Sequence, residues 1–258
     1  MENRIDTLFA QKPRNILSIY FCAGDPAPSM LLPTLRALQE AGVDMIEIGI
    51  PFSDPVADGP VIQNAASRAL HSGMSLRRLL RQLQGVRKEI HVPLLLMGYY
   101  NVVLQYGPEH FIDACAACGI DGCIIPDMPF EEYDAYYRRY AETRGIKFIF
   151  LVTPETSDDR IRSIDQGTSG FIYAVSSASV TGAQTSFSEA KQAYFSHLSD
   201  LSLKNPWLIG FGISNLATRQ AADQYANGVI VGSKFVSLLH ELQDPQTAVR
   251  ELLTALRS

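Results

Sequence analysis

Two acidic residues lie close together in the sequence, at positions where carboxylates are uncommon. Glu47 stands in the middle of the apolar run Met45–Ile50, and Asp58 follows in a segment rich in proline and glycine, Pro51–Pro60. A carboxylate inside an apolar strand costs free energy unless it has a partner or a catalytic task. Two carboxylates in different environments can hold different protonation states, as acid and base roles require.

The alternation of side chains along a strand predicts the direction of Glu47. The three isoleucines of Met45–Ile50 fall on one face and suit contacts with helices, so Glu47 falls on the opposite, interior face with Met45 and Gly49. Burial there should raise the pKa of its carboxyl. A glutamate satisfied by one internal hydrogen bond or salt bridge is the alternative, but perturbed buried carboxylates cluster at functional sites, which favours a catalytic role.

Asp58 is open to two interpretations. It precedes Gly59 and a predicted helix over Val61–Leu70, so its carboxylate could simply cap that helix. Asp54 is open to the same interpretation. Spacing alone does not separate capping from catalysis for either residue.

Two further patterns indicate a site at the ends of the later strands. Tyr173 should face the interior from the run Gly170–Val175, either as ordinary packing or as a site residue. Glycines follow each of the last three predicted strands, at Gly182, Gly212 and Gly232–Ser233. They could serve tight turns, but three at one corner favour phosphate binding through main-chain amides, for which no lysine or arginine is required.

Apolar runs alternate with helical periods along the whole chain. Eight runs are predicted strands: Ile16–Phe21, Met45–Ile50, Pro93–Met97, Gly122–Ile125, Lys147–Val152, Gly170–Val175, Trp207–Gly210 and Gly228–Val231. The helical periods are Met30–Ala41, Val61–Leu70, Leu76–Ile90, Phe111–Cys118, Glu131–Glu142, Asp158–Asp165, Glu189–Asp200, Leu216–Tyr225 and Thr247–Leu256.

This alternation predicts an α/β fold of parallel strands joined by helical crossovers. Because no linker or change of composition divides the 258 residues, we expect one domain, residues 1–258, folded as a (β/α)8 TIM barrel. A doubly wound open sheet is the alternative. Residues Ile5–Ala10 predict an extra N-terminal helix that plugs the lower end of the barrel.

Composition argues against several classes of function. A net charge of -5 does not suit a nucleic-acid surface, and no apolar run is long enough to span a membrane. The N-terminus lacks signal-peptide features, so we expect a cytoplasmic protein. One Cys-x-x-Cys occurs, at Cys115 and Cys118, but no second pair or nearby histidine completes a zinc site. We therefore expect two buried cysteines on one helix face, and no metal.

Several motifs together resemble the tryptophan synthase α chain family. The longest is Glu47–Gln63, which contains Pro51–Pro60. Shorter matches span nearly the whole chain and comprise Leu8–Phe9, Ala23–Pro26, Tyr99–Asn101, Asp127–Pro129, Val180–Gly182, Gly210–Ser214 and Val231–Ser233. Some positions depart from the family pattern: Ser177 and Ser179 stand where many relatives have Arg and Gly, and Tyr20 where Phe is common.

The resemblance implies a lyase of L-tryptophan biosynthesis, which cleaves indole-3-glycerol phosphate to indole and glyceraldehyde 3-phosphate in a reversible retro-aldol reaction. It implies that Glu47 is the general acid and base, that Asp58 accepts the indole N–H, and that Tyr173 assists near the glycerol hydroxyls. Phosphate-binding positions would be Gly182, Gly212, Gly232 and Ser233; pocket positions would be Tyr20, Met97, Ile124, Thr181 and Phe211.

The resemblance also implies a partner, the β chain of an α2β2 heterotetramer. Pyridoxal phosphate would belong to that β chain, and this chain would need no cofactor. The segments expected to touch the partner are Pro51–Val56, Asn101 and Asp127–Pro129, because they lie on the mouth side from which indole must leave. Two alternatives remain: a non-catalytic regulatory subunit, which the presence of both Glu47 and Asp58 disfavours, and a free-standing lyase that releases indole.

Overall fold

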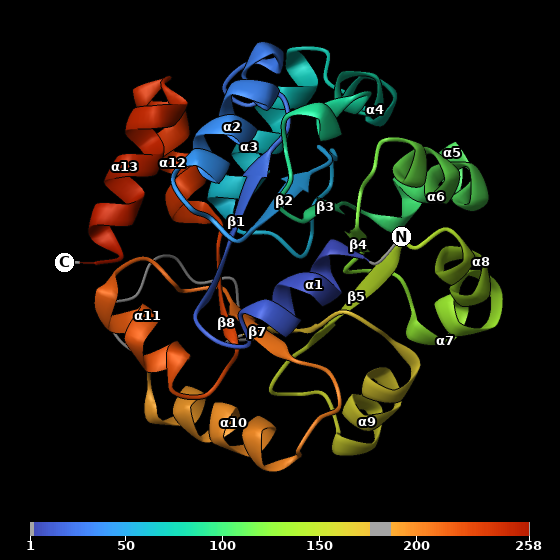
Figure 1. Ribbon diagram of the computed structural model, residues 1–258, viewed down its shortest axis with the longest axis vertical. Coiled ribbons are helices and arrows are strands. Elements are labelled where there is room, and N and C mark those ends of the chain that lie inside the picture. The colour runs from blue at the N-terminus through green and yellow to red at the C-terminus, as the bar shows by residue number, and fades with distance from the viewer. Residues whose placement is uncertain (1–2, 176–186, 258) are drawn as a thin grey trace.

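Eight parallel strands close into a barrel in the computed structural model, which describes residues 3–175 and 187–257 (Figure 1). The strands are β1 Ile16–Cys22, β2 Met45–Gly49, β3 Leu94–Met97, β4 Gly122–Ile124, β5 Lys147–Val152, β6 Ile172–Val175, β7 Trp207–Gly210 and β8 Gly228–Val231. β1 pairs with both β2 and β8, with Ile16 opposite Gly228. This closure confirms the predicted TIM barrel and excludes the open doubly wound sheet.

Helices surround the strands on the outside of the barrel (Figure 1). They are α2 Leu31–Glu40, α3 Pro60–His71, α4 Leu76–Leu83, α5 Tyr100–Tyr106, α6 Pro108–Ala117, α7 Phe130–Glu132, α8 Arg138–Thr143, α9 Asp158–Gly167, α10 Glu189–Asp200, α11 Leu216–Asp223, α12 Ser233–Leu242 and α13 Pro245–Ala255. Strand residues are buried from both sides, by the helices and by the barrel interior, so the strands are apolar almost throughout.

Two helical predictions need correction, and one helix was missed. The predicted helix Leu76–Ile90 ends at Leu83, because Gly85 adopts a positive φ of 77°, and only a 3-10 turn, Val86–Lys88, follows. Glu131–Glu142 is not one regular helix, since a π-helical segment, Tyr133–Tyr137, separates α7 from α8. Helix α5 was not predicted at all, because its seven residues are too few to show a clear period.

The predicted N-terminal helix is present as α1, Arg4–Gln11, and lies across the lower end of the barrel, where the strands begin (Figure 1). Ile5 is fully buried, and its Cδ1 atom would lie 3.2 Å from a Cβ added at Gly122, the first residue of β4. Phe9 packs against Phe171 with 6.0 Å between ring centroids. Apolar contacts of this helix therefore close the barrel from below.

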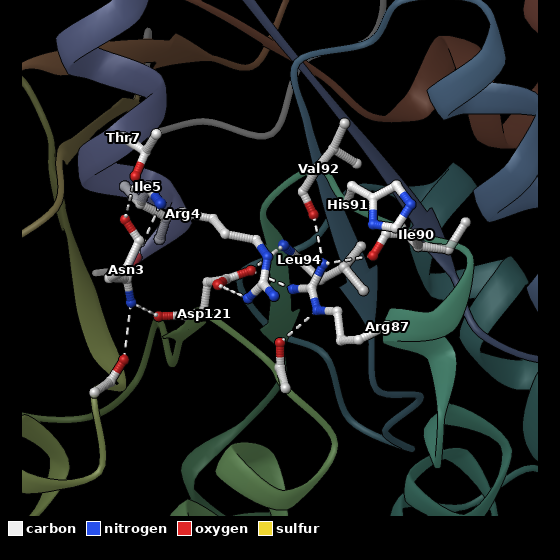
Figure 2. Close-up of polar contacts among 12 residues, drawn as sticks. Asn3, Arg4, Ile5, Thr7, Arg87, Ile90, His91, Val92, Leu94 and Asp121 are labelled. Carbon is white, nitrogen blue, oxygen red and sulfur yellow. Dashed lines mark hydrogen bonds and ion pairs between the residues drawn. The ribbon is translucent and has the colours of Figure 1, made fainter. Parts of the chain in front are cut away.

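A buried carboxylate ties α1 to this lower end (Figure 2). Asp121 accepts hydrogen bonds from Arg4, from Arg87 and from the main-chain N–H of Leu94, and Asn3 donates to its carbonyl oxygen. The Arg87 guanidinium also donates to the carbonyl oxygens of Ile90 and Val92 in Figure 2. Asp121 therefore joins the N-terminal helix to the first residues of β3 and to the segment just before β4.

Asp121→Asn is expected to lower the free energy of unfolding by about 3 kcal/mol, because it leaves Arg87 partly buried beside an uncharged partner. Chemical denaturation of wild type and variant measures this difference. Asp134→Asn is a suitable control, since the Asp134–Arg138 pair is exposed and should contribute less than about 1 kcal/mol. Equal losses in the two variants would show that the Asp121 network does not stabilise the barrel.

Candidate active site

Glu47 points into the barrel from β2 and is fully buried, in agreement with the alternation of the strand. The Ser18 hydroxyl donates to its Oε1 atom at 2.8 Å, whereas Oε2 has no hydrogen-bond partner among the described residues. Burial raises the pKa of this carboxyl to about 8, although the Ser18 hydrogen bond opposes the rise. At neutral pH Glu47 therefore holds a proton that it can donate.

Asp58 lies in the loop after β2 and is also buried, with 6% of its surface exposed. Its Oδ2 atom accepts from the Tyr99 hydroxyl at 2.8 Å, and Oδ1 is buried without a partner in the described chain. Burial raises its pKa to about 6, opposed by the Tyr99 hydrogen bond, so Asp58 is ionised at neutral pH. Helix α3 begins after Gly59 and, among the described residues, has no side-chain cap, so Asp58 is not a capping residue.

Tyr99 fixes the loop that carries Asp58, and no role for it followed from the sequence. Besides donating to Asp58, its hydroxyl accepts from the main-chain N–H of Ala57 at 3.0 Å. Its ring stacks on Phe52, with 5.0 Å between centroids. Its position just beyond the end of β3, where barrel enzymes carry their chemistry, was the available signal.

Tyr99→Phe is expected to reduce turnover about tenfold while leaving the substrate KM within about threefold, because the ring stays in place and only the hydrogen bonds that orient Asp58 are lost. Steady-state kinetics measures both constants. Because the Tyr99 hydrogen bond holds the pKa of Asp58 down, its loss should raise that pKa and shift the acidic limb of the rate profile to higher pH. An unchanged kcat and an unchanged profile would contradict the assignment.

Two tyrosines lie beside both carboxylates inside the barrel. Burial raises the pKa of Tyr20 and of Tyr173, and the negative charges of Glu47 and Asp58 raise both further. A Cβ atom added at Gly49 would collide with the Tyr20 hydroxyl, and one added at Gly210 would collide with the Tyr173 ring. These two glycines therefore make room for aromatic side chains next to the paired acids.

A cavity of about 360 Å³ opens at the upper end of the barrel, where the strands end. Asp58, Tyr20, Met97, Tyr173 and Phe211 contribute to its wall. The Phe211 ring meets the Tyr173 ring edge to face at 6.2 Å. An apolar, aromatic wall with one ionised carboxylate suits a flat ring system that carries an N–H donor.

The remainder of the cavity wall comes from the loops after β7 and β8. Gly212, Gly232 and Ser233, the positions expected to bind phosphate, all line it. Helix α12 begins at Ser233 without a side-chain cap among the described residues, so its first amides remain available to an anion. Helix α11 differs, because the capping box of Asn215 and Thr218 already occupies its first turn.

Some predicted site residues lie elsewhere. Glu47 and Ile124 are fully buried and do not line the cavity in this structure; Ile124 belongs to the core of β4. Thr181 and Gly182 lie outside the described residues, as do Ser177 and Ser179. Lys234, which does line the cavity, was missed because amides alone were expected to hold an anion.

A sequence model of the family described as "Tryptophan synthase alpha chain" matches residues 7–258. The chain belongs to the tryptophan synthase alpha chain family. A member from Bacteroides thetaiotaomicron is 55% identical over 99% of this chain and 100% of its own length, and one from Phocaeicola vulgatus is 54% identical over 99% and 100%.

Solved structures of tryptophan synthase agree with this assignment. Subunit alpha from Legionella pneumophila superposes with a TM-score of 0.86 at 34% identity, covering 100% of this chain and 98% of its own. A chain of tryptophan synthase from Mycobacterium tuberculosis superposes with a TM-score of 0.88 at 32% identity, covering 100% of both chains. The fold is therefore the family fold over its full length.

The cysteines and acidic residues show no arrangement typical of a metal centre in the described part of the chain. No group of three or more His, Cys, Asp or Glu side chains there could hold a metal ion. Cys115 in α6 and Cys118, the C-cap residue that follows it, are both buried thiols, as predicted, although α6 ends one residue before Cys118. Among the described helices, none combines the length and apolar character needed to cross a membrane.

Proposed function

We propose that this chain cleaves indole-3-glycerol phosphate to indole and glyceraldehyde 3-phosphate. The observation that carries the proposal is the pair of buried carboxyls with opposite protonation states at neutral pH, a protonated Glu47 and an ionised Asp58. They lie beside a cavity that has an aromatic wall and an anion-binding corner, which match the two ends of this substrate. Membership of the family supports the same reaction.

Glu47 moves the proton that the reaction requires. Its carboxyl donates a proton to C3 of the indole ring, and the resulting carboxylate takes the proton of the adjacent side-chain hydroxyl. The bond from C3 to the side chain then breaks, its electron pair restores the indole ring, and the hydroxyl carbon becomes the aldehyde. To reach the substrate, Glu47 must rotate away from Ser18, which costs about 1 kcal/mol for one hydrogen bond.

Asp58 stabilises the charge that appears during this step. Protonation at C3 places positive charge on the ring, and its N–H becomes a stronger donor to the ionised carboxylate. Tyr173 lies beside both carboxyls and is proposed to contact the glycerol hydroxyls. Gly212, Gly232 and Ser233, with Gly182, are proposed to bind the phosphate.

A β chain is the proposed partner, in an α2β2 assembly in which pyridoxal phosphate belongs to the β chain. The proposed contact segments Pro51–Val56, Asn101 and Asp127–Pro129 follow β2, β3 and β4, on the side of the barrel where the cavity opens. Val56 is 80% exposed, which is unusual for an apolar side chain and suits a surface covered by a partner. We also propose a cytoplasmic location.

The proposal is tested by measuring indole release from indole-3-glycerol phosphate across pH. The log of kcat/KM should form a bell, falling below about pH 6 as Asp58 gains a proton and above about pH 8 as Glu47 loses one. Addition of a β chain should form a complex that elutes earlier in size-exclusion chromatography. A chain that binds the β chain but releases no indole at any pH would be a regulatory subunit instead.

A further inference from the structure

Lys234 is the one lysine or arginine among the described residues that line the cavity. It is the second residue of α12 and follows Gly232 and Ser233, where the phosphate is proposed to bind. Among the described residues, it has no ion-pair or hydrogen-bond partner. The residue is partly buried, and no described neighbour neutralises its ammonium group.

The helix geometry directs this side chain toward the anion corner. Side chains on an α-helix tilt toward its N-terminus, so the stem of Lys234 leads back toward Ser233 and Gly232. The other charged residue that α12 contributes to the cavity is Glu241. It lies about 10 Å further along the helix axis.

The negative charge around the cavity would oppose the binding of a phosphate unless a cation compensates it. Its described wall carries two carboxylates, Asp58 and Glu241, and the protein as a whole has a net charge of -5. A phosphate monoester brings nearly two further negative charges at neutral pH. Amides at a helix terminus supply only partial positive charge, so an ammonium group beside them adds a full compensating charge.

We propose that Lys234 forms an ion pair with the phosphate of the substrate and sets the affinity for a phosphorylated ligand. This inference rests on the proposed function, because it assigns the phosphate end of that substrate. Lys234 is a binding residue in this role and takes no part in the proton transfers. Its contribution is made equally in the ground state and the transition state, so it should affect KM and leave kcat unchanged.

Lys234→Met tests this, since it keeps most of the aliphatic stem and removes the charge. KM for indole-3-glycerol phosphate should rise about tenfold at low ionic strength, with kcat within about twofold. Lys234→Arg should restore KM to within about threefold of wild type. The matched control is Lys88→Met, which removes the same charge from an exposed site near the start of β3, at the other end of the barrel, and should leave KM unchanged.

A second measurement needs no turnover. Inorganic phosphate should raise the melting temperature of wild type and of Lys88→Met above its value in chloride of equal ionic strength, and should do so much less for Lys234→Met. A Lys234→Met variant whose KM and phosphate-induced shift both equal those of Lys88→Met would overturn the inference. If wild type released no indole at all, the proposed function would fail, while the phosphate shift would still report separately on Lys234.

Discussion

Glu47→Gln should reduce indole release by at least about a thousandfold while the barrel remains folded. A glutamine has nearly the same shape as a protonated glutamic acid and can still accept from Ser18, so the packing of β2 is preserved. It cannot donate a proton to C3 or take one from the hydroxyl. A positioned general acid or general base each contributes about two to four orders of magnitude to the rate. Single-turnover assays on purified variant measure the loss.

The stability of the same variant gives an independent check on the environment of Glu47. Its pKa is raised from 4.5 to about 8 in the folded state, so the folded protein binds more protons than the unfolded chain between these values. Wild-type stability therefore falls as pH rises from about 4.5 to 8. Glu47→Gln lacks this titration. The melting temperature of the variant minus that of wild type should therefore increase as the pH rises across this range.

Exposed Glu142→Gln serves as the control in both experiments, because Glu142 lies on the outer surface in a pair with Arg138. It should match wild type in turnover and in the pH dependence of melting. If Glu47→Gln released indole as fast as wild type, the assignment of Glu47 as general acid and base would be wrong. A constant melting difference between pH 5 and pH 8 would show that Glu47 is not a buried acid with a raised pKa.

Asp58→Asn is expected to lower kcat by about a hundred- to a thousandfold, the loss typical of removing one group that stabilises transition-state charge. Asparagine can still accept from Tyr99 through its carbonyl oxygen, but it then presents an NH₂ group toward the cavity. That donor would face the indole N–H, which is also a donor. The developing positive charge would lose its carboxylate, and the ring would meet an unfavourable contact.

A substrate methylated on the indole nitrogen separates this role from a general loss of structure. Such a substrate has no N–H to donate but still develops positive charge on its ring, so the loss caused by Asp58→Asn should be clearly smaller on it than on the natural substrate. An equally large loss on both substrates would mean that Asp58 does not act by accepting the N–H.

Much of the fold was predictable because its signals are periodic and local. Buried parallel strands are short apolar runs, and seven of the eight agree with the prediction to within one residue at each end. The exception is β6, which starts at Ile172 and not at Gly170. Gly170 has a φ of 107°, so its backbone is not extended and does not continue the strand. The end of α4 at Leu83 and the π-helical segment Tyr133–Tyr137 escaped prediction. The first is tied to the positive φ of Gly85, and neither has a periodic signal in the sequence.

The site was predictable only in part, for a different reason. Alternation along β2 placed Glu47 in the interior, because strand geometry links neighbouring residues directly. Spacing alone left Asp58 ambiguous between capping and catalysis, and only the resemblance implied its role; the hydroxyl that holds its carboxylate belongs to Tyr99, distant in sequence. Lys234 was passed over because main-chain amides alone were expected to hold the anion, although it follows directly on Gly232 and Ser233. Contacts between separate β/α units, such as that of Tyr99 with Asp58, cannot be predicted from the spacing of neighbouring residues in the sequence.

The attachment of α1 has a practical consequence for handling the protein. Asn3 and Arg4 are held at the lower end of the barrel, and the cavity opens at the upper end. A linker joined ahead of Asn3 would therefore leave the molecule on the side away from the cavity. Immobilisation on a surface through such a linker should orient every molecule with its substrate entrance facing the solution, and the segments proposed to meet the β chain would stay accessible.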